Sequence, residues 1–418
     1  MNSGKRQQNN LKDDNDSRLF TWFTIAGDAV PIVVLFIVAI SVPFAVGSRY
    51  DLSKSQLSSW ILIGWALPAA LSLIFIIRYK QPLLLTGNIF TWIFIGSLSQ
   101  AHSFPEVIGA VIVTGIGMLI IGLLGLTSIV AAIIPYPVVL GLLCGAILPF
   151  VSDIFTLVPS TPLVIGAILL SYILSRRFLG NHIPAVLPSL FVGLIIAAVT
   201  RQFSLPSEVA LFPVLAITKP IFSIDTIITA VPTLLVLVVL QSNVPSTAML
   251  RNQDYQPPER TVNAIGGIAT AAGSFLGPIA VSFSLPITSI LANAKSHNTR
   301  SKQTIAVIGA MSLLMIALFA GFAAEVPSIV PMSVLLTIAG LSMFEIFVRS
   351  IRQIVDSPIA IGPLLAFVIT LSSIELLGLG NQFWALVVGT AVSYLLEKEG
   401  LNRLRDSTIS RTKSSTKS

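Results

Sequence analysis

Long apolar runs separated by short polar segments occupy the sequence from residue 22 to residue 396. Most runs have about 17–25 residues, the length of helix that spans a hydrocarbon core about 30 Å thick. The runs at 82–98 and 278–294 are interrupted by Pro, Gly and Ser and do not fit plain helices. The pattern predicts an all-α polytopic membrane protein with about fourteen transmembrane segments. The predicted segments are 22–46, 57–77, 82–98, 106–124, 127–150, 162–176, 183–200, 223–248, 261–277, 278–294, 304–323, 326–347, 358–376 and 381–396.

The composition fits a protein that is embedded in a lipid bilayer. Hydrophobic residues make up 54% of the 418 residues and charged residues only 10%, compared with roughly 25% charged in an ordinary soluble domain. The apolar stretch after the polar tail 1–21 is much longer than the apolar part of a signal peptide, so we expect this tail to be retained. The single cysteine, Cys144, excludes an intrachain disulfide and a thiolate metal cluster.

The formal net charge of +7 is better explained by membrane topology than by nucleic-acid binding. If both tails are cytoplasmic, the inner loops carry eleven Lys and Arg residues, including Lys302, and the outer loops carry only four. Cytoplasmic loops are enriched in these residues. We therefore expect an even number of segments in the cell (inner) membrane, with the N-terminal tail 1–21 and the C-terminal tail 397–418 both in the cytoplasm.

A weak internal repeat has an offset of 196 residues. Residues 82–88 align with 278–284, and Pro135 aligns with Pro331, each proline lying in a similar local sequence. Two matches at one offset indicate two halves of seven segments, and a unit with an odd number of segments is inserted upside down when it is repeated once. The predicted parts are a first half at 22–200, an extracytoplasmic linker at 201–222 and a second, inverted half at 223–396.

The first matched pair predicts where a solute binds. Each copy has a few extended residues, then small polar residues, then an apolar helix, so a half-helix begins inside the membrane in segments three and ten. The first N–H groups of such helices lack intrahelical partners, and broken backbone at that depth implies a polar cavity. In an inverted repeat the two helix N-termini face each other and favour an anion. The alternative is that Gly87 and Pro286 are kinks in continuous helices.

The candidate substrate-binding residues come from these two segments and from a pair of amides in the eighth segment. Buried amides in lipid must find partners, and here both contact with solute and hydrogen bonding between helices are open interpretations. The candidates are Thr86, Gly87, Asn88, Gln241, Asn243, Ser282 and Ser284.

The stretch 241–258 contains Gln241, Asn243, a Leu-Arg pair, Tyr255 and two prolines. It resembles the benzoate membrane transport proteins, whose eighth helix carries a Gln-Asn pair followed by Leu-Arg, Gly-Tyr and prolines. The resemblance covers most of the chain, although Asp254 stands where that family has Gly. The family is similar to uracil/xanthine permeases and sulfate permeases. The resemblance implies a core domain of segments one to four and eight to eleven, with the other segments forming a gate domain.

Ionisable residues inside the predicted segments are few. Asp28 in the first segment is the candidate for proton coupling, because an acid inside the membrane is functional by default, and a structural role is the alternative. His102, His182 and His297 fall in predicted loops, so we expect them to be solvated at the surface. No metal-ligand spacing, nucleotide-binding loop or hydrolase motif is present, so we expect neither a cofactor nor an enzymatic activity.

These observations predict a secondary active transporter for proton-coupled symport of a small organic anion, such as benzoate or a similar aromatic carboxylate. The alternatives are a permease or channel of the same fold for an inorganic anion (sulfate or bicarbonate) or for a nucleobase. A membrane-embedded enzyme is disfavoured. The partners are then the anionic solute, the proton and the lipid bilayer. The sequence leaves open whether the protein forms a homodimer.

Overall fold

Helices form nearly all of the regular structure in the described part of the chain. This computed structural model describes residues 22–179, 184–204, 206, 209–294, 298–372 and 374–404. Residues 22–39 are helical and lead into α2 (Ser41–Arg49). The other helices of the first half are α3 (Lys54–Tyr79), α4 (Ile89–Ser97), α5 (Phe104–Leu124), α6 (Thr127–Ile133), α7 (Tyr136–Leu157), α8 (Pro162–Phe178) and α9 (Val186–Val199).

The described second half contains nine α-helices and the partner of a short strand in the first half. The α-helices are α10 (Ile224–Val238), α11 (Val244–Arg251), α12 (Glu259–Gly273), α13 (Leu285–Ala292), α14 (Thr299–Leu318), α15 (Ala320–Ile329), α16 (Met332–Val355), α17 (Ile361–Leu371) and α18 (Asn381–Leu396), of which α15 is a short connecting helix. A π-helical segment, Val239–Asn243, joins α10 to α11, and a 3-10 turn, Ser274–Leu276, follows α12. Strands β1 (Leu85–Gly87) and β2 (Val281–Phe283) form the only sheet of the described residues.

Local sequence signals set many helix ends. Helices α3 and α5 begin with capping boxes, in which Ser53 pairs with Gln56 and Ser103 pairs with Glu106. Helix α5 ends at Gly125, whose φ of 69° lies in the left-handed region that glycine adopts without strain.

Seven helices in the described part are long and apolar enough to cross a membrane, judged by length and composition. The other predicted segments coincide with shorter helices or with the strand-and-helix segments, so the number of fourteen crossings stays a prediction. The seven are Trp22–Arg49, Lys54–Tyr79, Phe104–Leu124, Tyr136–Leu157, Ile224–Arg251, Thr299–Leu318 and Met332–Val355.

Two predicted segments, 127–150 and 326–347, were wrong as continuous helices. The chain breaks inside each of them, between α6 and α7 at Pro135 and between α15 and α16 at Pro331. Both prolines are extended, with ψ of 125° and 131°, and serve as the N-cap of the long helix that follows. Proline has no N–H to continue the preceding helix, so it ends one helix and begins another.

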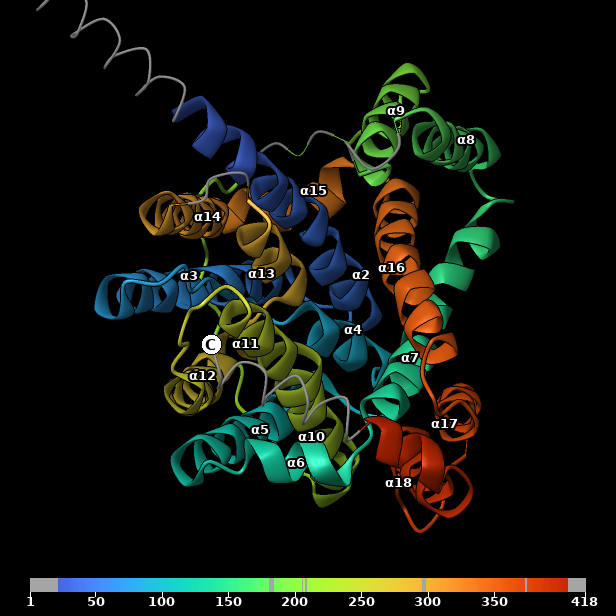
Figure 1. Cartoon of the computed structure of the whole chain (residues 1–418). Coiled ribbons are helices and arrows are strands. Elements are labelled where there is room, and N and C mark those ends of the chain that lie inside the picture. The colour runs from blue at the N-terminus through green and yellow to red at the C-terminus, as the bar shows by residue number, and fades with distance from the viewer. Residues whose placement is uncertain are drawn as a thin grey trace, which may run out of the picture.

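The helices pack as two groups (Figure 1). The strand-bearing group consists of α2–α5 and α10–α14 around β1 and β2, and within it α5 packs on α12 and α3 on α14. The strand-free group consists of α7–α9 and α16–α18, in which α7 packs on both α16 and α17. Helix α15 lies against α3.

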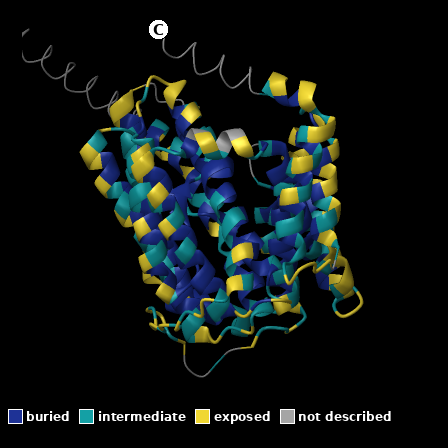
Figure 2. Ribbon diagram, turned by 90° about the horizontal axis from the view of Figure 1, so that it is seen from below, coloured by how far each residue is buried: buried dark blue, intermediate teal, exposed yellow. Residues whose placement is uncertain are grey.

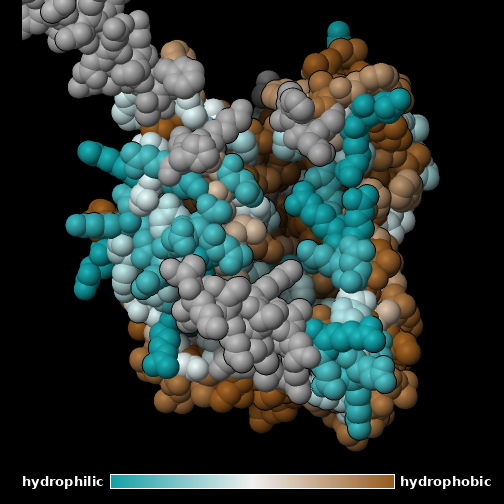
Figure 3. All heavy atoms as spheres, viewed as in Figure 1, coloured by the Kyte–Doolittle hydropathy of each residue, from teal (hydrophilic) through white to brown (hydrophobic). Residues whose placement is uncertain are grey.

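Burial and hydropathy follow the pattern expected for a bilayer protein. Buried residues fill the middle of the bundle, whereas exposed residues lie along its outer helix faces and loops (Figure 2). Large apolar side chains such as Ile77, Val199 and Leu395 are exposed on the outside of their helices. Hydrophilic residues gather on the face seen in Figure 3, with hydrophobic atoms at its edges, and the surface is hollowed between the two helix groups.

Candidate functional site

The two sequence-related segments meet at the centre of the strand-bearing group. Strands β1 and β2 are antiparallel, with Leu85 opposite Phe283, Thr86 opposite Ser282 and Gly87 opposite Val281. The backbone N–H of Asn88 extends the pairing by donating to Ala280 O at 2.8 Å. Each strand runs directly into a short helix, α4 or α13. Because the strands are antiparallel, these two helices leave the strand pair in opposite directions, which is the arrangement expected of two half-helices rather than of kinked continuous ones.

The N-terminus of α4 is closed by its own cap. Asn88 Oδ1 accepts the backbone N–H groups of Phe90 at 3.0 Å and Thr91 at 3.2 Å. The Asn88 amide nitrogen donates to the hydroxyls of Ser242 at 2.8 Å and Ser282 at 3.0 Å. The buried Asn88 side chain is therefore fully engaged inside the protein, and it occupies the place where an anion would meet α4.

The N-terminus of α13 is different. Its N-cap residue, Ser284, makes no side-chain capping hydrogen bond, and Pro286 in the first turn has no N–H to offer. Ser284 and Leu285 are half-buried, whereas the strand residues just before them are buried. Of the two short helices, α13 is thus the one whose first turn keeps backbone donors and the positive end of its dipole available.

The Asn243 side chain supports strand β2. Its Oδ1 accepts the backbone N–H of Phe283 at 2.9 Å, and its Nδ2 donates to Asn263 Oδ1 at 2.7 Å. Asn263 in turn donates to Thr127 Oγ1 at 3.2 Å, so one chain of amides ties the π-helical segment to α12 and α6. Asn243 therefore forms hydrogen bonds with other elements of the fold. Such bonding was one of the two interpretations of this residue in the sequence.

Gln241 lies two residues earlier in the same π-helical segment, and its surroundings differ. Only 5% of it is exposed, yet Oε1 has no hydrogen-bond partner among the described residues. Its described neighbour from the strand-free group is Tyr136, the first residue of α7. A buried amide oxygen without a donor costs about 1–3 kcal/mol. This oxygen is a place where a solute or a water molecule would be stabilised.

The other three candidates contribute mainly to packing. A side chain at Gly87 would place its Cβ 2.6 Å from Gly64 O and 2.9 Å from the Trp92 ring, so glycine is needed for the close approach of α3. Ser282 Oγ donates to Phe283 O at 2.8 Å, and Thr86 is buried opposite it. Sequence reasoning missed Trp65 and Trp92, whose indole N–H groups are buried beside this region and have no hydrogen-bond partner in the part of the chain that the structure describes. A single tryptophan in an apolar run does not indicate whether its N–H group will have a hydrogen-bond partner.

Asp28 lies at the far end of α13 from the strand pair. Its charge interacts with that of Lys302, whose ammonium donates to Ala292 O at 2.8 Å at the C-terminus of α13. Only 6% of Lys302 is exposed, so its prediction as a loop residue was wrong: it belongs to the first turn of α14 and is covered by the end of α13. Asp28 itself is half-buried.

The expected surface exposure of His102 was also wrong. The side chain is 6% exposed, because the first turn of α10 closes over the loop that carries it. His182 and His297 lie outside the described residues. Within the described residues, no group of three or more His, Cys, Asp and Glu side chains is placed to hold a metal ion.

Broken helices that meet at a strand pair among membrane-length helices are an arrangement typical of multi-pass membrane transport proteins. Solved structures share the fold. The transmembrane domain of a cyanobacterium bicarbonate transporter, BicA, matches 90% of this chain and 96% of its own, with a TM-score of 0.54 and 14% identity. SLC26A9 matches 89% of this chain and 65% of its own, with a TM-score of 0.55 and 15% identity.

The family follows from the sequence match. The model of the benzoate membrane transport protein family matches residues 21–395, so the chain belongs to that family, which is one of transporters rather than enzymes. A benzoate membrane transport protein of Acinetobacter baylyi is 24% identical over 90% of this chain and 95% of its own length. The inner membrane protein YdcO of Escherichia coli is 23% identical over 82% of this chain and 84% of its own.

Proposed function

We propose that this protein is a secondary active transporter for symport of a proton and a small organic anion, such as benzoate or a similar aromatic carboxylate. The observation that carries the proposal is the uncapped N-terminus of α13 next to the π-helical segment that holds Gln241. The backbone N–H donors of α13 suit a carboxylate. The sequence has no Lys or Arg in 82–98 or in 278–294, so these backbone donors would hold the anion without a basic side chain from either segment. In this proposal Ser284 and Gln241 contact the solute, while Thr86, Gly87, Asn88, Asn243 and Ser282 shape and hold the site.

Transport in this proposal requires movement of one domain against another, and two inverted halves, 22–200 and 223–396, would provide it. The same offset of 196 residues separates the first residues of β1 and β2, of α4 and α13, and of α7 and α16. The strand register is also symmetric under this offset, because the pair Leu85–Phe283 maps onto the pair Val281–Gly87. These regularities support a twofold axis through Thr86 and Ser282. The strand-bearing group would then be the core domain that moves against the gate domain, with both termini in the cytoplasm of the cell.

The proposed contact between Gln241 and the solute predicts that Gln241→Leu weakens benzoate binding. We expect purified protein in detergent to bind benzoate saturably, and we expect the variant to bind it about tenfold more weakly, which corresponds to about 1.4 kcal/mol. The control is Gln100→Leu at an exposed position, which should bind as the wild type does. Wild-type affinity in folded, monodisperse Gln241→Leu would exclude this residue from the site.

Transport itself is tested in reconstituted vesicles by counterflow of benzoate against aromatic acids, nucleobases, sulfate and bicarbonate. Accumulation of benzoate above its external concentration, driven by a pH gradient, supports the proposed symport. Equilibration of sulfate or bicarbonate without accumulation of any solute would instead support an inorganic anion channel of the same fold.

Asp28 is proposed to take part in proton coupling through its charge interaction with Lys302 at the C-terminus of α13. If so, Asp28→Asn should lose at least tenfold in benzoate uptake driven by a pH gradient and keep benzoate exchange at equal pH. Asp254→Asn is the matched control, because Asp254 is exposed and its φ of 61° is one that asparagine tolerates. Undiminished pH-driven uptake in Asp28→Asn would assign this residue to structure alone.

A further inference from the structure

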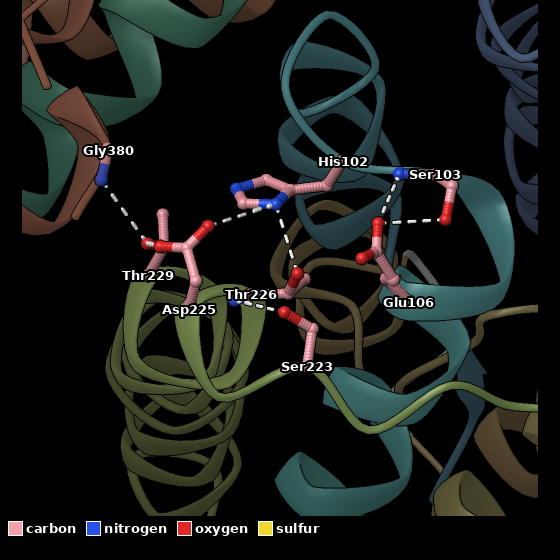
Figure 4. A network of polar contacts seen from close by, with 8 residues as sticks. All are labelled: His102, Ser103, Glu106, Ser223, Asp225, Thr226, Thr229 and Gly380. Atoms are coloured by element: carbon pink, nitrogen blue, oxygen red, sulfur yellow. Dashed lines mark hydrogen bonds and ion pairs between the residues drawn. The ribbon is translucent and has the colours of Figure 1, made fainter. Parts of the chain in front are cut away.

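A second ionisable cluster lies at the opposite end of the strand-bearing group from Asp28. It is centred on His102, in the loop after α4, and α4 leaves the strand pair in the direction opposite to α13. His102 Nδ1 lies 3.0 Å from Thr226 Oγ1 and 3.7 Å from Asp225 Oδ2, both in the first turn of α10 (Figure 4). The imidazole is therefore buried against a carboxylate and a hydroxyl.

The two ring nitrogens of His102 have different surroundings. Nδ1 faces Asp225 and Thr226, whereas Nε2 makes no hydrogen bond with a described residue (Figure 4). A carboxylate next to Nδ1 favours the tautomer that carries its proton on Nδ1. The lone pair of the neutral ring then lies on Nε2, which is the atom that can accept a further proton.

A cavity adjoins His102. It has a volume of about 510 Å³ and is lined by His102 and the loop around it, and also by Arg49, Tyr50 and Asp51. Water in this cavity could deliver a proton to the imidazole.

The charged groups around this cavity include one arginine and several carboxylates. Arg49 forms an ion pair with Asp153 of α7 at 2.6 Å, so its charge is compensated. Glu106, on the first turn of α5, adds a second carboxylate near His102 and is held by the N–H and hydroxyl of Ser103. Burial raises the pKa of the Tyr50 hydroxyl, which stays neutral and donates to Ile95 O.

Asp225 also connects this cluster to the strand-free group. Its other oxygen, Oδ1, accepts the Thr229 hydroxyl at 3.5 Å, and Thr229 Oγ1 accepts the backbone N–H of Gly380 at 3.3 Å (Figure 4). Gly380 is the N-cap residue of α18. The series His102, Asp225, Thr229 and Gly380 therefore crosses from one helix group to the other.

We propose that His102 and Asp225 form a proton-binding site of the transport cycle. An acid in the cavity water donates a proton to Nε2, and the resulting imidazolium keeps its Nδ1 proton on the side of Thr226 Oγ1, which accepts it, with the Asp225 carboxylate next to the ring. The new positive charge attracts the Asp225 carboxylate and weakens it as the acceptor of the Thr229 hydroxyl. Proton occupancy thereby alters the contact with Gly380, across the boundary between the two groups. This inference deepens the proposed proton-coupled symport and rests on it.

The test compares His102→Gln and Asp225→Asn with wild-type protein in vesicles. Each variant should lose at least tenfold in benzoate accumulation driven by a pH gradient, while benzoate counterflow at equal pH stays within twofold of wild type. The rate of uptake should also lose its dependence on external pH between about 5 and 8, the range in which histidine titrates. Asp51→Asn is the matched control, because Asp51 lines the same cavity and has no ion pair or hydrogen bond to His102 among the described contacts.

A second measurement does not depend on transport. Wild-type protein in weakly buffered detergent with a pH-indicator dye should take up protons when benzoate is added, and His102→Gln should take up fewer. If His102→Gln does not fold, Asp225→Asn carries both tests. Wild-type pH dependence and wild-type proton uptake in a folded variant would overturn the assignment of the site. A wild-type protein that exchanges benzoate without any response to pH would instead overturn the proposed proton coupling.

Discussion

Gly87→Leu is expected to prevent stable folding. The new side chain would have to occupy space that Gly64 O and the Trp92 ring already fill, at 2.6 and 2.9 Å from the Cβ position. A backbone oxygen cannot move aside as a flexible side chain can, so the cost should reach or exceed the roughly 1–3 kcal/mol typical of overpacked cores. We expect little monodisperse protein by size-exclusion chromatography and a strongly lowered melting temperature.

Gly166→Leu is the control for this substitution. Gly166 lies on α8 with no atom within 4 Å of its Cβ position, so leucine should be accepted there. A Gly87→Leu protein that melts with the wild type but fails to bind benzoate would contradict the packing role, and would mean that the solute lies against the backbone at this position.

Asn243→Ala should destabilise the protein by about 2 kcal/mol, because it leaves the buried Phe283 N–H without an acceptor and removes one partner of Asn263. The measurement is thermal unfolding in detergent. Gln241→Ala is the matched control from the same segment: its amide oxygen has no hydrogen-bond partner among the described residues, so this variant should lose less melting temperature than Asn243→Ala. Equal melting temperatures for both variants, with benzoate binding lost only in Asn243→Ala, would make Asn243 a solute contact instead.

The sequence predicted the extended residues and the short helices that follow them because their signals are local. Proline, small polar residues and extended apolar residues recur at one offset, and they mark backbone breaks wherever the chain is placed. The roles of the individual polar residues depend on distant contacts. Asn88 and Ser284 occupy equivalent positions, yet Asn88 caps its own helix and bonds to Ser242, whereas Ser284 makes no capping hydrogen bond. Pro286, at the position of Phe90, is the local difference, because it removes one N–H group that a cap would accept; the bond to Ser242 has no local signal.

The errors at His102 and Lys302 have the same origin. His102 lies in the loop after α4 and Lys302 in the first turn of α14, and each is buried because another helix, α10 or α13, packs over it. The breaks at Pro135 and Pro331 did carry a local signal, since a proline cannot donate to the preceding turn. The same two prolines therefore mark both the internal repeat and the helix ends.

The pairing of β1 with β2 has a consequence for synthesis of the protein. When the ribosome has delivered the first half to the membrane, the edge of β1 has no partner, because β2 belongs to the second half of the chain. Unpaired backbone inside a bilayer is costly, so this segment needs shelter from the insertion machinery until translation reaches Val281–Phe283. A chain that stops short of that point would present an open strand edge in the membrane, a feature by which quality-control proteases could recognise it as incomplete.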